Sequence, residues 1–233
     1  MEKQNLVLIP GLLCDAAMWE HQSRHLSATA EIKIADVTRS ETMIGMAEAV
    51  LAMAPEKFAL AGLSMGGYVS LEIIRRAPER VTKLALLDTS ARSDTQEQSR
   101  RRHHFIQLTR EGGFDEVVLT LLPLLVHPDR MQDEQLCNSI KEMMRRVGAE
   151  IFMRQQAAII GRPDSRNDLT PIKCSTLILC GRQDALTPLE VHEEMSSRIP
   201  KARLAIIEDC GHMSTMERPH AVTALLRDWL LYW

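Results

Sequence analysis

The sequence predicts an α/β fold in which a mostly parallel, doubly wound sheet is covered by helices on both faces. Three observations carry this prediction. Short apolar segments of strand length alternate with segments whose apolar residues recur at helical spacing. Several apolar segments are continuous, which is typical of strands buried on both faces of a parallel sheet. The 233 residues suit one large domain of this class.

The expected strands number about six, and each is a short apolar run that ends at a turn. They lie at residues 6–9, 32–37, 58–61, 84–87, 176–180 and 204–207. Alternation of these strands with helices implies a mostly parallel sheet with both faces covered.

Several helices between these strands have recognisable start or stop residues. Asp15 is expected to cap a helix that carries Trp19, and another helix is expected from about Thr42 to Met53. The helix that follows residue 66 should end before Pro78, because proline disfavours helical geometry in the preceding residue.

Two further helices are expected in the last part of the chain. In Thr187-Pro188-Leu189-Glu190, threonine would cap a helix and proline would take its first position. The closing helix places Val222, Leu225, Leu226 and Trp229 on one face.

Residues 91–170 differ from the rest, because they contain helical patterns but no convincing strand. We expect residues 1–90 and 171–233 to form the core, and residues 91–170 to form a helical insertion. The apolar centre of the insertion, residues 119–126, could line a substrate pocket, pack the insertion, or do both. Arg100–Arg102 could hold an anionic substrate, although a solvated helix face is the favoured interpretation.

The segment Gly62-Leu63-Ser64-Met65-Gly66-Gly67 joins an expected strand to an expected helix. A sharp strand-to-helix turn crowds the backbone, so glycine is favoured two residues before and two residues after the residue at its tip. Such a turn holds the Ser64 hydroxyl exposed at the start of the helix. This arrangement is a nucleophile elbow, in the structural context that the motif requires.

Parallel strands point the same way, so the residues that follow each strand gather at one edge, where ligands bind. Ser64, Asp184 and His212 all follow expected strands, and so does the Pro10-Gly11-Leu12 turn. A serine hydroxyl needs a base to remove its proton, and an imidazole base needs a carboxylate to orient it. These three side chains therefore predict a Ser-His-Asp catalytic triad.

The chain resembles the α/β-hydrolase fold family over nearly its whole length. The elbow at Ser64, the acid loop Gly181–Pro188 and the histidine loop, Gly211-His212-Met213 followed by Glu217-Arg218-Pro219, are similar to the family's motifs and occur in its order. The resemblance implies that residues 91–170 form a cap, or lid. It also implies that the first strand here corresponds to the family's third. Asp88, at another strand end that some members use for the acid, is the alternative to Asp184.

The same resemblance implies an oxyanion hole built from the backbone N–H groups of Leu12 and Met65. Pro10-Gly11 stands where the family has a His-Gly pair. Backbone donors do not depend on the side chain, so the hole can survive, but the proline removes any hydrogen bond that the histidine provides.

Composition narrows the possible partners and compartments. The net charge of -3 gives no reason to expect a nucleic-acid or anionic-membrane partner. No apolar run approaches the ~20 residues of a membrane span, and Met1–Asn5 leads into an apolar run too short for a signal peptide. We therefore expect a cytoplasmic protein. The five cysteines form no C-x-x-C pair and are expected to be free thiols, most of them half-buried.

The eight histidines lack metal-ligand spacing, so no metal is expected. His21, His25, His127, His192 and His220 are expected to be surface or structural residues.

These features predict a soluble serine hydrolase that cleaves a small carboxylic ester through an acyl-enzyme and needs no cofactor. The same triad could instead cleave a carbon–carbon bond, a lactone or a thioester, and a cofactor-free haloperoxidase-type activity is a more distant alternative. From another class, a ligand-binding, receptor-like protein on this fold with little turnover is the alternative.

Overall fold

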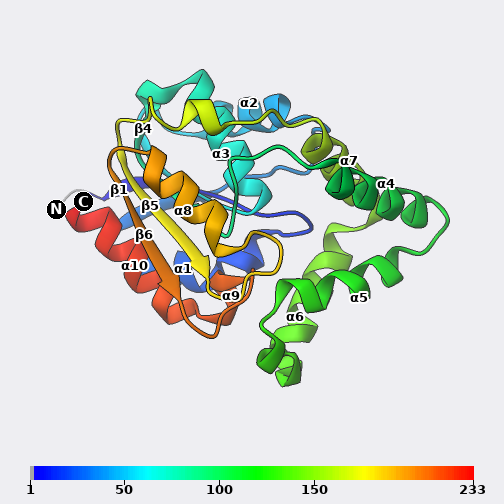
Figure 1. The fold of residues 1–233 in the computed structure, drawn as a ribbon. Helices are drawn as coiled ribbons and strands as arrows, with labels where there is room; N and C mark the ends of the chain where they lie inside the picture. Colours follow the sequence, from blue (N-terminus) through cyan, green and yellow to red (C-terminus); the bar gives the residue numbers. More distant parts are fainter. Residues whose placement is uncertain (1–2) are drawn as a thin grey trace.

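The computed structural model describes residues 3–233. Met1 and Glu2, the first residues of the N-terminal segment that is too short for a signal peptide, lie outside the described residues. Six strands form one sheet (Figure 1). They are β1 (Gln4–Ile9), β2 (Ala30–Ile34), β3 (Phe58–Leu63), β4 (Val81–Leu87), β5 (Ser175–Gly181) and β6 (Ala202–Ile207). Every neighbouring pair is parallel. The predicted fold class and strand count are confirmed.

The helices alternate with these strands along the chain. They are α1 (Glu20–Leu26), α2 (Met43–Met53), α3 (Met65–Arg76), α4 (Gln96–Arg110), α5 (Phe114–Leu125), α6 (Glu134–Val147), α7 (Ala149–Ile160), α8 (Leu189–Arg198), α9 (Ser214–Glu217) and α10 (Pro219–Tyr232). Short 3₁₀ helices lie at Ala16–Trp19, Pro78–Arg80, Pro128–Gln132 and Arg166–Asp168. Across residues 3–233, no helix has the length and apolar character needed to cross a bilayer.

Two apolar layers bury the faces of the sheet. Along β1, Leu6 and Leu8 belong to the cluster that contains Leu26 of α1 and Trp229 of α10. Val7 and Ile9 belong to the opposite cluster, with residues of α2, α3 and α8. Alternate strand residues point to opposite faces, so strands buried on both sides must be apolar at every position. This requirement explains the continuous apolar runs.

The order of the strands, β2-β1-β3-β4-β5-β6, creates a switch point in the sheet. From β1 the chain passes outward to β2, whereas from β3 it passes the other way to β4. Ligand sites of open α/β sheets lie at such a point, beyond the carboxyl ends of the strands. The turns that follow β1 and β3 carry Leu12 and Ser64.

Helices α4 to α7 occupy the segment between β4 and β5, and no strand interrupts it in the described structure. Figure 1 shows these green helices gathered at one side, apart from the helices that cover the sheet. Ion pairs join the segment to the core, including Arg92–Glu194 at 2.7 Å and Arg146–Asp15 at 2.7 Å. The division at residues 90 and 170 stays a prediction.

Two element boundaries differ from the predictions. The second strand pairs with β1 over Ala30–Ile34 rather than 32–37, because it is an edge strand with β1 as its one neighbour. Thr187 does not cap α8: Pro188 takes that position, and the Thr187 hydroxyl donates to Asp184 instead. Asp15 caps as expected, but the turn that it begins is 3₁₀ before α1 starts.

Candidate active site

Ser64 occupies the tip of a sharp turn between β3 and α3. Its backbone has φ 54° and ψ -118°, a conformation that L-residues rarely adopt. A Cβ on Gly62 would overlap the Gly66 carbonyl, and a Cβ on Gly66 would overlap the Ile9 carbonyl. These close approaches explain why the turn needs both glycines.

The neighbouring strand end fixes this turn. The Ser64 N–H donates to the Leu87 carbonyl at 2.9 Å, and the Thr89 hydroxyl donates to the Ser64 carbonyl at 2.8 Å. The Thr89 N–H in turn donates to Nε2 of His192 at 3.0 Å. Burial lowers the pKa of His192 to about 4, so this ring is a neutral acceptor. His192 is therefore structural, as expected.

Ser64, His212 and Asp184 form a continuous chain of hydrogen bonds. His212 Nε2 lies 2.8 Å from Ser64 Oγ, and His212 Nδ1 lies 2.8 Å from Asp184 Oδ2. Asp184 and His212 are buried, whereas Ser64 is partly exposed. An ionised carboxylate only accepts, so it keeps the proton on Nδ1 and leaves Nε2 free to accept the serine proton.

The Asp184 carboxylate is held by three further donors. Oδ1 accepts from the N–H groups of Leu186 and Thr187, and Oδ2 accepts from the Thr187 hydroxyl at 2.6 Å. Burial alone would raise the pKa of Asp184, but His212 and the Thr187 donors outweigh burial and lower it. The carboxylate is therefore ionised. From the sequence alone, a Thr187 that donates to Asp184 could not be distinguished from a Thr187 that caps the following helix.

Hydrogen bonds to α5 and α9 anchor the loop that carries His212. The N–H groups of His212 and Met213 donate to the Leu125 carbonyl, each at 3.0 Å. Glu217 is buried and accepts from the N–H groups of Gly211 and His127. Burial of the imidazole lowers its pKa, but the charge and hydrogen bond of Asp184 prevail and raise it above 6.5.

Asp88, the alternative acid, lies behind this site. It is fully buried, accepts from the Gly181 N–H at 3.0 Å, and makes a short contact with the Ser214 hydroxyl. No hydrogen bond joins it to His212 within the described part of the chain, whereas Asp184 contacts that ring directly. Burial and the neighbouring Asp184 charge raise the pKa of Asp88 well above 3.8. The geometry favours Asp184 as the acid.

The backbone N–H groups of Leu12 and Met65 have no hydrogen-bond acceptor in residues 3–233. Met65 is the first residue of α3, where the N–H points out of the helix and the helix dipole favours negative charge. The loop after Pro10 turns at Leu13, which has φ 58° and donates its N–H to Gln155 Oε1 at 3.0 Å. Gln155 comes from α7, a contact that no sequence motif indicated.

A cavity of about 270 Å³ opens at this site. Ser64, His212 and Leu12 line it, and Phe105, Leu121, Leu125, Met144 and Ile159 form an apolar wall. Of the predicted apolar segment 119–126, Leu121 and Leu125 therefore face the cavity, whereas Leu119 is exposed. This volume lies just below the usual range of about 300–1,000 Å³ for ligand sites, so it indicates a small ligand.

The predicted solvated face at Arg100–Arg102 is wrong for Arg102, whose side chain is 16% exposed, whereas Arg100 and Arg101 are exposed. Arg101 and Arg102 line the cavity, together with Arg92 and Arg162. The physical reason is that Arg102 lies against Asp94 and Gln156, which hold its guanidinium at the cavity wall. Arg100 is exposed and does not line the cavity.

The other chemically reactive residue types have structural positions. All five cysteines are free, and burial raises the pKa of the Cys14 and Cys180 thiols to about 12. In the region that the structure describes, no group of His, Cys, Asp and Glu side chains is arranged to hold a metal. His21 stacks on His25 and meets His220 edge to face, and His127 is buried.

Comparisons with known proteins agree with this architecture. The chain is 24% identical over 247 aligned positions to a pimeloyl-[acyl-carrier protein] methyl ester esterase of Aromatoleum aromaticum, with 98% of each protein covered. It is 30% identical over 179 positions to a 2-hydroxy-6-oxononadienedioate/2-hydroxy-6-oxononatrienedioate hydrolase of Escherichia coli, covering 75% of this chain and 62% of that one.

Among solved structures, a thermophilic esterase from Thermogutta terrifontis matches with a TM-score of 0.90 and 28% identity, covering 97% of this chain and 89% of that one. An enol-lactonase from Burkholderia xenovorans LB400 has the same fold, with a TM-score of 0.91 and 24% identity over 99% of this chain and 92% of that one. A family model described as alpha/beta hydrolase fold matches residues 46–219. The chain therefore belongs to the α/β-hydrolase fold family.

Proposed function

We propose that the protein hydrolyses a small carboxylic ester through an acyl-enzyme on Ser64. The observation that carries the proposal is the chain of hydrogen bonds from Ser64 Oγ through His212 to Asp184, at the wall of a small cavity. The curated relatives support an ester or acyl hydrolase in general, since they are named as a methyl ester esterase and a dienedioate hydrolase.

In the first half of the reaction, Ser64 Oγ attacks the ester carbonyl while His212 Nε2 takes its proton. Asp184 stabilises the imidazolium that forms, because its carboxylate already accepts from Nδ1. The N–H groups of Leu12 and Met65 donate to the oxyanion, and one such donor contributes about 10²–10³ in kcat. His212 then protonates the departing alcohol, which leaves an acyl group on Ser64.

In the second half, water replaces the alcohol. His212 removes a proton from the water, which attacks the acyl carbonyl, and the same N–H groups stabilise the second oxyanion. Return of the proton to Ser64 Oγ releases the carboxylic acid. Apart from the attacking water, every step uses groups of this chain, so the mechanism requires no cofactor.

We further propose that residues 91–170 act as a cap over the site. Phe105, Leu121 and Met144 come from this segment and form part of the cavity wall. The Leu125 carbonyl accepts from the N–H groups of His212 and Met213, so the segment also holds the His212 loop in place. The cytoplasmic location expected from the sequence remains a prediction.

The test is the turnover of p-nitrophenyl esters of increasing acyl length by wild type, Ser64→Ala and Ser70→Ala. Ser70→Ala is the matched control, because it removes a buried hydroxyl from the same helix. We expect activity that falls with acyl length, a loss of about 10⁴ or more in Ser64→Ala, and near-normal turnover in Ser70→Ala. Wild-type turnover by Ser64→Ala would refute the mechanism.

Labelling by a fluorophosphonate probe separates the alternatives. Labelling of Ser64 without ester turnover would favour carbon–carbon, lactone or thioester cleavage by the same side chains. The similarity to a dienedioate hydrolase and to an enol-lactonase makes carbon–carbon and lactone cleavage the nearest of these alternatives. Neither labelling nor turnover would favour a ligand-binding protein.

A further inference from the structure

The cavity beside Ser64 has a strongly basic wall. Four arginines line it, Arg92, Arg101, Arg102 and Arg162, and among the described residues that line it there is no Asp or Glu. Serine, threonine and glutamine side chains surround them, namely Ser90, Ser93, Thr95, Gln98 and Gln156. The cavity therefore has an apolar part and a cationic part.

Behind this wall, one carboxylate is shared by two of the arginines. Asp94 Oδ2 lies 2.6 Å from Arg102 Nε, and Asp94 Oδ1 lies 2.8 Å from Arg162 Nη1. The Asp94 side chain is 2% exposed, and those of Arg162 and Arg102 are 6% and 16% exposed. Two guanidinium groups thus share a single negative charge in a place where water screens them poorly.

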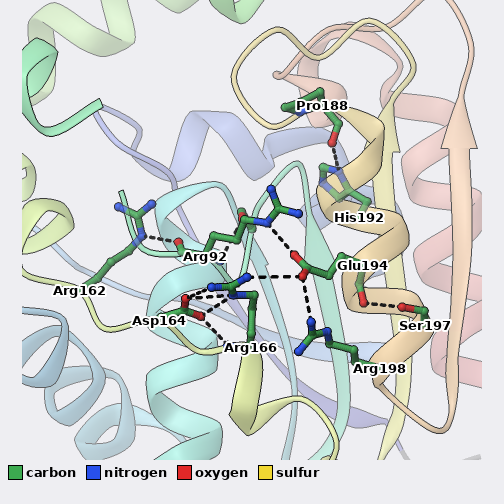
Figure 2. Close-up of polar contacts among 10 residues, drawn as sticks. Arg92, Arg162, Asp164, Arg166, Pro188, His192, Glu194, Ser197 and Arg198 are labelled. Carbon is green, nitrogen blue, oxygen red and sulfur yellow. Dashed lines mark hydrogen bonds and ion pairs between the residues drawn. The ribbon is translucent and has the colours of Figure 1, made fainter. Parts of the chain in front are cut away.

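The third arginine, Arg92, shares its carboxylate as well. Glu194 Oε2 lies 2.7 Å from Arg92 Nε, while Glu194 Oε1 lies 3.1 Å from Arg198 Nη2 (Figure 2). The same figure shows Arg162 donating to the Arg92 carbonyl, at 3.2 Å. The Arg162 guanidinium is therefore held against the Arg92 backbone, and the single charge of Glu194 is shared between Arg92 and Arg198.

Arg101 is the remaining arginine of the wall. It lies on α4 next to Arg102, and within residues 3–233 no carboxylate comes within ion-pair distance of its guanidinium. A network that served the fold alone would match the buried charges of Arg102 and Arg162 one for one, because buried cations are costly unless paired. Arg101 is exposed and does not bear that cost, but it adds a further cation at the cavity. This wall instead has an excess of cations that face the cavity.

We propose that the cationic part of this cavity binds a carboxylate of the substrate, so that the enzyme prefers esters that carry a second, ionised carboxyl group. The inference rests on the proposed function, because it names the substrate class of the same site. Guanidinium groups suit this task, since they remain charged and present paired donors that match a carboxylate. The small volume of about 270 Å³ suits one short chain between the carbonyl and the anionic end.

The carboxylate could belong to the acyl part or to the alcohol part of the ester, and two substrate pairs distinguish these sources. The acyl pair is mono-p-nitrophenyl adipate against p-nitrophenyl hexanoate. The alcohol pair is 5-acetoxypentanoate against pentyl acetate, followed by titration of the released acid. Within each pair the two esters have similar length and differ mainly in charge.

We expect kcat/KM to favour the charged ester of one pair by about 10- to 100-fold, as charge-assisted hydrogen bonds predict. Arg101→Gln should lower this preference about tenfold while it leaves the uncharged ester nearly unchanged. Arg100→Gln is the matched control, because it removes the same charge from the same helix outside the cavity. It should keep the wild-type preference.

Equal rates for charged and uncharged esters in both pairs would overturn the inference. An equal loss of the preference for the charged ester in Arg100→Gln and Arg101→Gln would also overturn it. That result would indicate that the overall positive charge of the protein, rather than a binding site, attracts the carboxylate. In either case, turnover of the uncharged esters that depends on Ser64 would leave the proposed function intact. Turnover by Ser64→Ala would instead reject the proposed function.

Protection of Ser64 gives a second measurement that does not depend on ester turnover. Adipate should slow fluorophosphonate labelling of the wild type, and the uncharged 1,6-hexanediol should not. Arg101→Gln should need about tenfold more adipate for the same protection, and Arg100→Gln should behave as wild type. Labelling that adipate does not slow would overturn the inference even if none of the four esters is cleaved.

Discussion

Replacing each of the two buried carboxylates at the site by its amide separates their roles. Asp184 Oδ1 accepts two backbone N–H groups, so the amide oxygen of Asp184→Asn takes that place and turns its NH₂ toward His212. The amide then donates to Nδ1, which moves the imidazole proton to Nε2. In that tautomer Nε2 cannot accept the Ser64 proton. We expect kcat to fall about 10⁴-fold, or about 5 kcal/mol of barrier.

Asp88→Asn is the matched control, because the amide reproduces a protonated carboxyl. Its oxygen can accept from the Gly181 N–H and its NH₂ can donate to Ser214. We expect kcat within about threefold of wild type, since burial and the Asp184 charge raise the pKa of Asp88 and so favour the protonated form that the amide resembles. The assay is turnover of a short p-nitrophenyl ester. An equal loss in both variants, or none in Asp184→Asn, would refute the assignment.

Asp88→Asn should also change the dependence of stability on pH. A carboxyl whose folded-state pKa lies above its unfolded value of 3.8 binds more protons in the folded state, so stability falls as pH rises above that value toward the folded pKa. Asparagine does not titrate. The Tm of Asp88→Asn should therefore exceed that of wild type at neutral pH and approach it in acid. A Tm difference that grows in acid would contradict this linkage.

Three more predictions concern the base, the carboxylate and the turn. His212 must be neutral to accept a proton, and its pKa lies above 6.5, so kcat/KM should still be rising with pH at about pH 6. A pH profile that is already flat at pH 6 would contradict the assignment of His212 as the base. Thr187→Val removes the hydroxyl that donates to Asp184 and should lower kcat about tenfold, whereas Thr187→Ser keeps a hydroxyl and should retain activity. Equal kcat in the two variants would contradict a role for this hydrogen bond. Gly66→Ala should lower the free energy of unfolding by about 1–3 kcal/mol in urea, because its Cβ meets a backbone carbonyl. Gly161→Ala, which has room, should change it by less than about 1 kcal/mol, and equal losses would refute the steric argument.

Much of the fold follows from local sequence features, because two-face burial forces continuous apolar strands and a tight turn forces glycine. Those constraints are local, so the strands and the turn at Ser64 could be recognised without coordinates. The strand ends then place Ser64, Asp184 and His212 at one edge, and the structure brings these side chains into contact. Their catalytic roles remain the proposal that the mutants test.

Two of the contacts that could not be predicted join segments that are distant in the sequence. Gln155 reaches the Leu13 N–H across 142 residues, and the Leu125 carbonyl accepts from the His212 loop. Arg102 belongs to a charge-rich helix whose sequence resembles that of any solvated face, but its contacts with Asp94 and Gln156 hold it at the cavity wall. Thr187 satisfies the pattern of a helix cap equally well, but the Asp184 carboxylate competes successfully for its hydroxyl.

The measurement that tests the central claim most directly is the mass of the protein during turnover. Rapid acid quenching of the enzyme with p-nitrophenyl acetate, followed by peptide mass spectrometry, should find one acetyl group on Ser64. His212→Ala and Ser64→Ala should carry none. Acetyl groups on another residue, or turnover of the ester without any covalent intermediate at Ser64, would contradict the account.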